Sequence, residues 1–394
     1  MRCRNLYVHF PFCRGKCTYC ALHSRAGVSP STREAYVRRL AAAVERLAAE
    51  GTGPFETVYF GGGTPTLCDL GPLLKVLRPL LAPGAEFTVE AHPLDVTDDL
   101  MARLADGGVN RLSMGVESLE NAVLAEMRRG YDWATAARAF ACAARRFDNA
   151  GIDLIVGYPG ESDFEPEVFG RLADWGLRHC SVYSLILEEK SILAHQLAKG
   201  TDPSATLPSD DVTLDRLAKI AAYLAGLGLE RYEISNYAVP GYACRHNLAV
   251  WRGEDYLGLG EGAHGRLGLA RTRNHWGQSL SGKGGQAPIG KGGQAPITAG
   301  GQAPNGGQTT NEGGQAPDDL EGTEIEWVSE RTDWIERRLF RLRTREGIDL
   351  ADCPEWRAVL DRHVADGLLT RTGSRYCPTS RGMEVCDSIL SDLV

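Results

Sequence analysis

Three cysteines near the start of the chain have a spacing that suits metal chemistry. Cys13, Cys17 and Cys20 follow one another in the pattern C-x3-C-x2-C. Three thiolates on one short loop can hold three irons of a [4Fe–4S] cluster and leave the fourth iron open to a small ligand. Such a cluster suits the binding and cleavage of a cofactor better than simple electron transfer. The spacing therefore predicts that these cysteines are metal ligands.

Zinc is the alternative metal for this loop. A structural zinc site normally takes a fourth Cys or His at similar spacing, and His9 and His23 flank the loop. Spacing of x3 followed by x2 is uncommon in zinc ribbons, so it favours the cluster without excluding zinc. A disulfide is disfavoured, because nothing in the sequence marks the chain as secreted.

A glycine-rich run, residues 61–66, follows the second expected strand. Glycine lets backbone amides and carbonyls approach a ligand closely, and Thr64 and Thr66 add hydroxyls. A phosphate loop is disfavoured because no Gly-Lys-Ser/Thr ending follows. A tight turn without a ligand is the simplest interpretation of the run alone. Together with the cysteine loop, the run indicates a cofactor site.

Length and composition limit the kind of protein this is. The 394 residues, 43% of them hydrophobic, suffice for one large domain and a smaller one. The formal net charge of -8 argues against a nucleic-acid partner. No signal peptide or apolar run of membrane-spanning length is recognisable. With eleven cysteines and no secretion signal, we expect a cytoplasmic protein without a transmembrane segment.

Short β-rich runs alternate with helical stretches along the first half of the chain. We expect strands at Leu6–Phe10, Thr57–Phe60, Phe87–Ala91, Arg111–Val116, Ile152–Gly157 and Ser181–Leu187. Helices are expected at Arg33–Ala49, Leu70–Leu81, Thr97–Asp106, Asn121–Arg129, Trp133–Asp148 and Phe164–Leu177. Ser31 with Glu34 matches a capping box for the first helix.

Six such repeats imply a parallel sheet with right-handed crossovers. The strands read as continuously apolar, as buried parallel strands do. We therefore predict an α/β fold, a partial (βα)6 barrel with its site at the carboxyl ends of the strands. Cys13 follows the first strand, Glu90 ends the third and Glu117 ends the fourth. Asp153 falls at the start of the fifth strand, so its side chain must reach inward from low in that strand.

The last third of the chain divides into distinct segments. Gly-Gly-Gln-Ala-Pro units recur within 279–320, and their composition predicts a disordered insertion. In 321–394 we expect helices at Thr332–Arg345 and Pro354–Asp366, a hairpin at 367–373 and a last helix from Thr379. Helices with a β wing indicate a winged-helix-like domain, and its acidic residues favour a structural role over DNA binding. Residues 1–230 would form the barrel and 231–278 a separate motif region.

The cysteine loop and the glycine run together resemble the radical S-adenosylmethionine (SAM) superfamily. In that superfamily the open iron binds the amino and carboxylate groups of SAM, and one electron cleaves the sulfonium to give a 5′-deoxyadenosyl radical. The resemblance implies that the glycine-rich strand end holds the methionine amino group. It also implies that Tyr19, before the last cysteine, lies near the adenine.

The resemblance narrows to the oxygen-independent coproporphyrinogen III oxidase family. Matching segments occur in order at 7–13, 60–66, 88–93, 111–118 and 153–160. The positions that this resemblance implies as SAM contacts are Tyr7, Gly62, Gly63, Thr64, Glu90, Glu117, Arg129 and Asp153. The family usually has Gln at position 117. A carboxylate there still accepts hydrogen bonds but adds charge and loses a donor.

Two branches of that family differ at positions that can be read here. The oxidases carry a further cysteine where this chain has Leu22, and an extension before the cluster where this chain has twelve residues before Cys13. Segments 232–238 and 244–251 instead resemble the heme chaperone branch, HemW, whose H-N-x-x-Y-W motif has Val250 in place of Tyr here. His246 is the implied heme-site residue; the alternative is a histidine that only hydrogen-bonds a neighbouring loop. We expect His264 to be structural.

The first hypothesis is therefore a radical SAM-type heme chaperone that binds a [4Fe–4S] cluster, SAM and heme, and delivers heme to acceptor proteins. The resemblance allows a homodimer and peripheral membrane contact, and no nucleic acid is expected. The second hypothesis is an enzyme that oxidatively decarboxylates coproporphyrinogen III to protoporphyrinogen IX. The third is a zinc or nucleic-acid module built on the cysteines and the winged tail.

Overall fold

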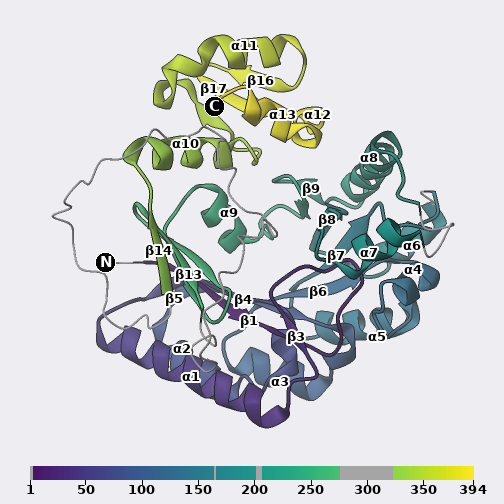
Figure 1. The fold of residues 1–394 in the computed structure, drawn as a ribbon, viewed down its shortest axis with the longest axis vertical. Coiled ribbons are helices and arrows are strands. Elements are labelled where there is room, and N and C mark those ends of the chain that lie inside the picture. Colours follow the sequence, from purple (N-terminus) through teal and green to yellow (C-terminus); the bar gives the residue numbers. More distant parts are fainter. Residues whose placement is uncertain (1–2, 164–165, 201–205, 276–322) are drawn as a thin grey trace.

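The structure, a computed structural model, describes the chain apart from residues 1–2, 164–165, 201–205 and 276–322 (Figure 1). The repeat segment predicted at 279–320 lies outside the described residues. A twelve-stranded sheet forms the body of the described part, and a three-stranded sheet belongs to the C-terminal module. None of the described helices combines the length and apolarity needed to cross a bilayer.

Six parallel strands lie side by side in chain order and confirm the predicted α/β barrel architecture. They are β1 (Asn5–Phe10), β4 (Phe55–Gly62), β5 (Leu81–Ala91), β6 (Arg111–Glu117), β7 (Asn149–Val156) and β8 (His179–Ser184). Each pairs in parallel with the next, so all their carboxyl ends lie at one rim of the sheet. The strand β7 begins earlier than expected, which places Asp153 beyond its middle rather than at its start.

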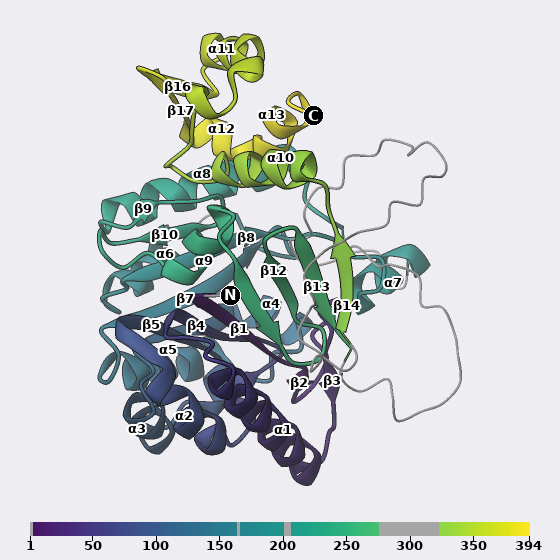
Figure 2. The ribbon, with the colours of Figure 1, turned by 90° about the vertical axis from the view of Figure 1, so that its left-hand side faces the viewer.

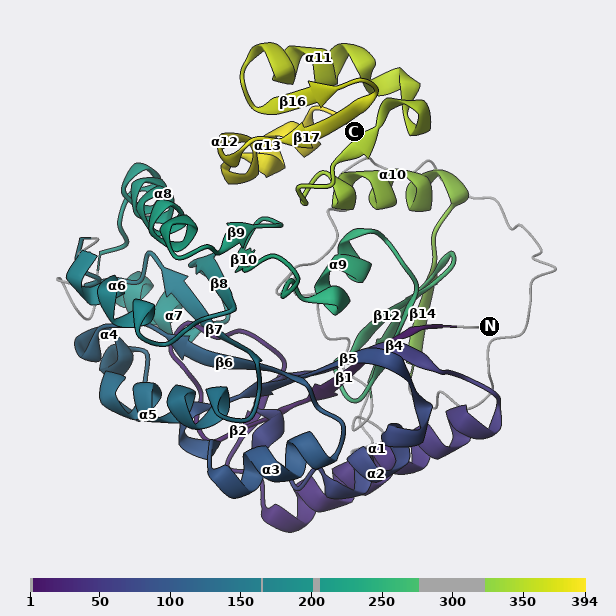
Figure 3. The same ribbon diagram turned by 180° about the vertical axis from the view of Figure 1, so that it is seen from behind.

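Helices cover the outer, convex side of this curved sheet (Figures 1 and 3). They are α1 (Pro30–Ala49), α2 (Gly71–Leu77), α3 (Asp98–Asp106), α4 (Asn121–Glu126), α5 (Trp133–Ala144) and α6 (Pro166–Ala173). The capping box predicted at Ser31 is wrong. Helix α1 begins earlier, because Pro30 suits the first helical turn and the Ser29 hydroxyl accepts a hydrogen bond from the Thr32 amide at 3.2 Å.

The strands alternate between apolar and polar residues, which corrects the prediction that they are continuously apolar. Along β5, Phe87 and Val89 join the apolar core. Thr88 and Glu90 point to the opposite face, where the Tyr59 hydroxyl donates a hydrogen bond to Glu90 at 2.8 Å. Strand side chains alternate between the two faces of a sheet. The inner face of this barrel is therefore polar although most of it is withdrawn from water, as a site for a polar ligand requires.

Further strands extend the sheet at both edges, and the sequence reasoning missed most of them. At one edge β11 (Tyr256–Leu259) pairs in parallel with β1. Antiparallel β12 (His264–Leu267), β13 (Ala270–Asn274) and β14 (Thr323–Trp327) follow it (Figure 2). At the other edge β10 (Asn236–Ala238) and β9 (Glu230–Arg231) continue from β8.

Three more helices accompany these edge strands: α7 (Ile192–Lys199), α8 (Asp210–Gly226) and α9 (Arg245–Trp251). Unlike the outer helices, α9 lies on the concave side of the sheet (Figures 1 and 3).

The C-terminal module has its own apolar core and combines helices with a hairpin, as the winged-helix-like prediction expects. Its elements are α10 (Glu330–Arg341), β15 (Ile348–Asp349), α11 (Arg357–Ala365), β16 (Leu369–Thr372), β17 (Arg375–Pro378), α12 (Ser380–Glu384) and α13 (Cys386–Ser391). The wing is the β16–β17 hairpin, which pairs Thr372 with Arg375 next to its turn.

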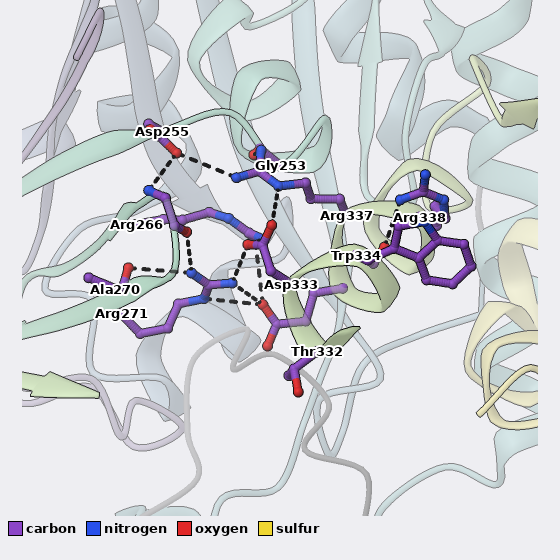
Figure 4. Close-up of polar contacts among 12 residues, drawn as sticks. Gly253, Asp255, Arg266, Ala270, Arg271, Thr332, Asp333, Trp334, Arg337 and Arg338 are labelled. Atoms are coloured by element: carbon purple, nitrogen blue, oxygen red, sulfur yellow. Dashed lines mark hydrogen bonds and ion pairs between the residues drawn. The ribbon is translucent and has the colours of Figure 1, made fainter. Parts of the chain in front are cut away.

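A charged network fastens α10 to the extended sheet (Figure 4). Asp333 of α10 pairs with Arg266 of β12 at 2.5 Å and with Arg271 of β13 at 2.8 Å. Glu336, one turn further along α10, pairs with Arg271 at 2.6 Å. The Arg266 side chain is only 4% exposed, so this network is largely withdrawn from water.

Candidate cofactor site at the carboxyl ends of the strands

The cysteine loop begins and ends in a short parallel pairing. Strand β2 (Phe12–Cys13) pairs with β3 (Arg25–Ala26), and the Arg25 amide donates to the Pro11 carbonyl at 2.7 Å. Cys13, Cys17 and Cys20 are therefore carried on one closed loop beyond β1. All three thiols are free and only partly buried, as metal ligands that must be reached by a cofactor should be.

One buried carboxylate, Asp95, holds the leading arm of the loop. Arg14, directly after the first cysteine, donates to Asp95 through Nε at 3.0 Å. The other oxygen of Asp95 accepts a hydrogen bond from the Thr66 hydroxyl at 2.9 Å. Asp95 thus ties the cysteine loop to the glycine run. The sequence reasoning did not identify it, although it closely follows the expected strand that ends at Ala91.

A second buried carboxylate, Glu261, holds the trailing arm. Its oxygens bind the His23 ring at 2.9 Å and the Arg25 guanidinium, and its amide donates to the Tyr36 hydroxyl at 2.8 Å. Glu261 belongs to the glycine-rich segment after β11, far from the cysteines in sequence. The glycine-rich segment could be recognised in the sequence, but the sequence does not reveal that Glu261 contacts the cysteine loop.

The two histidines that kept zinc open as an alternative are engaged elsewhere. The His9 ring contacts the Tyr7 hydroxyl at 2.9 Å through Nδ1 and the His23 carbonyl at 3.0 Å through Nε2. Burial lowers the pKa of His9 to about 4. His23 is bound to Glu261. Within the described ranges, no three thiol, imidazole or carboxylate groups are already gathered as a metal site.

The three cysteines nevertheless fit a [4Fe–4S] cluster better than zinc. They supply three thiols on one loop, and neither flanking histidine is free to act as a fourth ligand. Burial raises the pKa of both Cys13 and Cys20, so a cation is needed to hold them as thiolates. The Arg129 guanidinium donates a hydrogen bond to Cys17 Sγ at 3.3 Å and provides part of that positive charge.

The glycine run lies directly against the cysteine loop. The amides of Gly63 and Thr64 donate to the carbonyls of Phe10 and Phe12, both at 2.7 Å. A Cβ on Gly63 would lie 2.6 Å from the Phe12 carbonyl oxygen and 3.0 Å from Cys13 Sγ. Gly62 has a φ of 107°, which side chains rarely adopt. Both positions therefore require glycine, and the turn brings bare backbone to the thiols.

Three carboxyl groups gather on the inner face near the same rim. Glu90 accepts hydrogen bonds from the Tyr59 hydroxyl at 2.8 Å and the Gly62 amide at 3.1 Å. Burial and the nearby Asp153 raise the pKa of Glu90 to about 8. Asp153 accepts from the Ser113 hydroxyl at 3.1 Å, and burial raises its pKa as well. Together with Glu117, these carboxyl groups can bind a cation or accept hydrogen bonds from the hydroxyls of a ligand.

Glu117 and Arg129 form the remaining charged pair of the site. Their side chains lie 3.5 Å apart, and burial raises the pKa of Glu117 against the opposing effect of Arg129. Glu117 has a φ of 69°, a strained backbone angle for a non-glycine residue at the end of β6. Arg129 also donates to the Gly115 carbonyl at 2.7 Å and to the Tyr131 hydroxyl at 3.1 Å. It thereby joins β6 to the cysteine loop.

The two aromatic residues expected in the site lie at different depths. Tyr19 is part of the cysteine loop and interacts with Glu117 and Arg129, while burial raises its pKa far above the usual value. Tyr7 lies deeper on β1, stacked on Tyr59 with ring centroids 6.1 Å apart. The structure thus groups at one rim of the sheet the residues that the sequence proposed for the cluster and for SAM.

His246 is the exception, because it lies at the opposite end of the strands. Its Nδ1 contacts the Thr57 hydroxyl at 2.8 Å, low on β4, and the residue is only 4% exposed. Glu86 of β5 accepts hydrogen bonds from the His246 amide at 3.0 Å and the Arg245 amide at 2.9 Å, at the start of α9. Burial, followed by the charge of Arg111, lowers the pKa of His246 to about 3. The imidazole is therefore neutral and enclosed.

Comparisons with known proteins agree with this geometry. The family model described as the radical SAM superfamily matches residues 7–173. The chain is 36% identical to heme chaperone HemW of Mycobacterium tuberculosis (strain ATCC 25618 / H37Rv) over 282 residues, which cover 68% of this chain and 71% of that protein. It is 35% identical to heme chaperone HemW of Escherichia coli (strain K12), over 67% of this chain and 70% of that protein.

Among solved structures, the coproporphyrinogen III oxidase HemN of Escherichia coli, a radical SAM enzyme, has the same fold. Its TM-score is 0.73 at 22% sequence identity, with 99% of this chain and 89% of that chain covered. At this identity the likeness is one of fold alone. It extends through the C-terminal module as well as the barrel.

Proposed function

The chain belongs to the HemW family of radical SAM proteins, and from that premise we propose that it binds a [4Fe–4S] cluster, SAM and heme and delivers heme to acceptor proteins. The sequence identity to named heme chaperones supports the heme role. One observation carries the cofactor part. The cysteine loop, the glycine run and the partly buried carboxyl groups lie at one rim, where Arg129 joins Cys17 to Glu117 and the amides of the glycine run bind carbonyls next to the cysteine loop.

Each residue of the rim has a part in this proposal. Cys13, Cys17 and Cys20 hold the cluster, which when bound supplies the electron that cleaves SAM. The glycine run offers backbone groups to the methionine end of SAM, and Glu90 offers a carboxylate.

Glu117 can serve as a SAM contact although the family usually has Gln there. Arg129 lies 3.5 Å from its carboxylate and offsets the extra charge. The hydrogen-bond donor that Gln would supply is lost, but both carboxylate oxygens remain acceptors for the ribose hydroxyls.

Oxidation of coproporphyrinogen III is the second candidate function. The shared fold with HemN favours it. Leu22 counts against it, because the oxidases carry a cysteine at this position. The Leu22 side chain is 43% exposed on the cysteine loop, where that cysteine would have been available.

The heme role is tested by titrating the anaerobically reconstituted chain with heme and following the Soret band. If His246 contributes to the heme site, His246→Ala abolishes the shift seen with the unchanged chain. Thr57→Val is the matched control, because it removes the 2.8 Å contact to His246 but keeps the imidazole. Absence of any Soret shift would overturn the heme assignment. Equal loss in both variants would show that His246 acts by holding α9 in place.

The remaining expectations stay predictions. They are the identity of the acceptor proteins, a homodimer, peripheral membrane contact, a cytoplasmic location and the division into domains at 230, 278 and 320. Gel filtration with light scattering tests the homodimer directly.

A further inference from the structure

Arg111 is an unusual residue for the interior of a protein. It opens β6 and points to the inner face of the barrel, and the residue is 1% exposed. Within the described part of the chain, none of its three guanidinium nitrogens has a hydrogen-bond partner. It also forms no ion pair there, unlike Arg129 and Arg266. An arginine stays charged in proteins, and an unpaired buried charge is costly.

The neighbours of Arg111 in the sheet are also unsatisfied. Register places Thr88 of β5 on one side of it and Asn149 of β7 on the other. The Thr88 hydroxyl and the Asn149 side-chain oxygen are buried without partners, as is Nδ1 of the nearby His179. A row of adjacent strand residues therefore offers donors and acceptors that the described protein does not use.

Most polar side chains in the rows above and below this one have partners. Below it, Thr57 contacts Asn5 and His246, each at 2.8 Å, and Glu86 binds the first amides of α9. Above it, Glu90 is bound by Tyr59 and Gly62, and Ser113 donates to Asp153. The unused groups of Arg111, Thr88 and Asn149 thus lie side by side on three adjacent strands, with Nδ1 of His179 one row nearer the rim, which is the pattern of a ligand site.

We propose that this row is a carboxylate-binding site centred on Arg111, and that it takes a propionate group of a tetrapyrrole. A guanidinium binds a carboxylate through two parallel hydrogen bonds, and the Thr88 hydroxyl can donate a third. The walls suit an aromatic macrocycle, because Tyr7 and Tyr59 stand in the same row. The assignment to a tetrapyrrole rests on the proposed function; the carboxylate site itself does not.

The position of Arg111 also places the ligand next to the proposed SAM site. Thr88 and Glu90 are two residues apart on β5, a separation of about 7 Å along a strand. The same spacing separates Arg111 from Ser113, which binds Asp153. A tetrapyrrole anchored by one propionate at Arg111 would extend toward the rim where the cofactor residues lie.

Substitution of Arg111 distinguishes a ligand site from a structural one. Arg111→Met removes an unpaired buried charge and fills similar volume, so the variant without ligand should melt no lower than the parent. Sodium propionate should raise the melting temperature of the parent chain but not that of Arg111→Met. Thr88→Val, which removes an unpartnered hydroxyl from a strand, should keep the fold and weaken the propionate effect. A destabilised Arg111→Met chain that still responds to propionate would overturn the proposal.

Tetrapyrrole probes test whether the carboxylate bound at Arg111 is a propionate of a tetrapyrrole. Iron mesoporphyrin IX should bind Arg111→Met at least about tenfold more weakly than the parent, as expected for loss of a charged hydrogen bond. Its dimethyl ester should bind both chains equally. SAM binding should be the same in both chains, since a weaker SAM affinity would assign the site to the methionine carboxylate instead.

The test separates this inference from the function on which it rests. Tetrapyrrole affinity that changes neither on esterification of the propionates nor on Arg111→Met would overturn the inference and leave the heme role standing. Failure of every tetrapyrrole to bind would overturn the heme role and the propionate assignment together. The propionate melting data would then still decide whether Arg111 marks a carboxylate site.

Discussion

At the scale of single residues, the protonation of Glu90 controls the charge of the SAM site. Burial and Asp153 raise its pKa to about 8, so without SAM this carboxyl is mostly protonated at neutral pH. SAM is a cation, which favours the ionised carboxylate. We therefore expect SAM affinity to rise between pH 7 and pH 9, as the pH passes the pKa of Glu90. Isothermal titration of the reconstituted chain measures this, and Glu90→Gln should flatten the profile. An unchanged slope in that variant would contradict the assignment.

Glycine at position 63 should be indispensable for the cluster. A Cβ there would meet the Phe12 carbonyl at 2.6 Å and Cys13 Sγ at 3.0 Å, so Gly63→Ala must displace the cysteine loop. We expect much less iron and sulfide per chain after reconstitution, with a weakened visible absorption. Gly15→Ala is the matched control, since a Cβ at Gly15, within the same loop, meets nothing within 4 Å. Equal cluster content in the two variants would rule out this steric argument.

At the scale of elements, the sequence predicted the six parallel strands well, because each is bounded by loops and the first five are followed by a helical pattern. The inner polar face was harder to recognise. Tyr, His and Thr are compatible with a buried strand, so β1 and β4 read as apolar until the structure separates their two faces. The short edge strands were missed for another reason. Segments as brief as β9 and β10 carry no periodicity, and only long-range pairing defines them.

The candidate site was likewise only partly predictable from the sequence. Cysteine spacing and glycine runs are local signals, and both were recognised. Asp95 and Glu261 act through contacts with residues 81 and 236 positions away, which no local pattern reveals. The burial of His246 against Thr57 likewise follows only from the packing of α9 inside the barrel.

The cysteine loop should depend on its carboxylate anchors. Glu261→Gln removes the charge that holds Arg25 and His23, and we expect faster loss of the cluster on exposure to a chelator. The decay of visible absorption measures it. The exposed Glu45→Gln on α1 is the control and should decay like the unmodified chain. Identical decay in both variants would mean that Glu261 does not position the loop.

At the scale of the whole molecule, the Asp333 network joins the C-terminal module to the barrel sheet. Its three arginine partners lower the pKa of Asp333 to about 2 against the effect of burial. A depressed pKa contributes stability that is present above the unfolded value near 3.8 and is lost as the pH falls toward 2. The attachment of α10 should therefore weaken in acid.

Substitution tests the same network at neutral pH. Asp333→Asn leaves the buried Arg266 with only the longer pair to Glu336, at 3.5 Å, and should cost about 3 kcal/mol in the free energy of unfolding. Urea denaturation followed by tryptophan fluorescence measures the change, because Trp334 lies on the same helix. Asp99→Asn breaks a pair with Arg103 whose side chains are 76% and 63% exposed, and should change little. A similar loss in both variants would contradict a special role for the network.

Heme binding and porphyrinogen oxidation can be compared in a single experiment on the reconstituted chain. The chain carrying its cluster is incubated anaerobically with SAM, a reductant, heme and coproporphyrinogen III, and then separated by gel filtration with its tetrapyrroles identified. For a heme chaperone, heme should coelute with the protein and coproporphyrinogen III should remain unconverted. Protoporphyrinogen IX formed in place of retained heme would contradict that role and make this chain an oxidase.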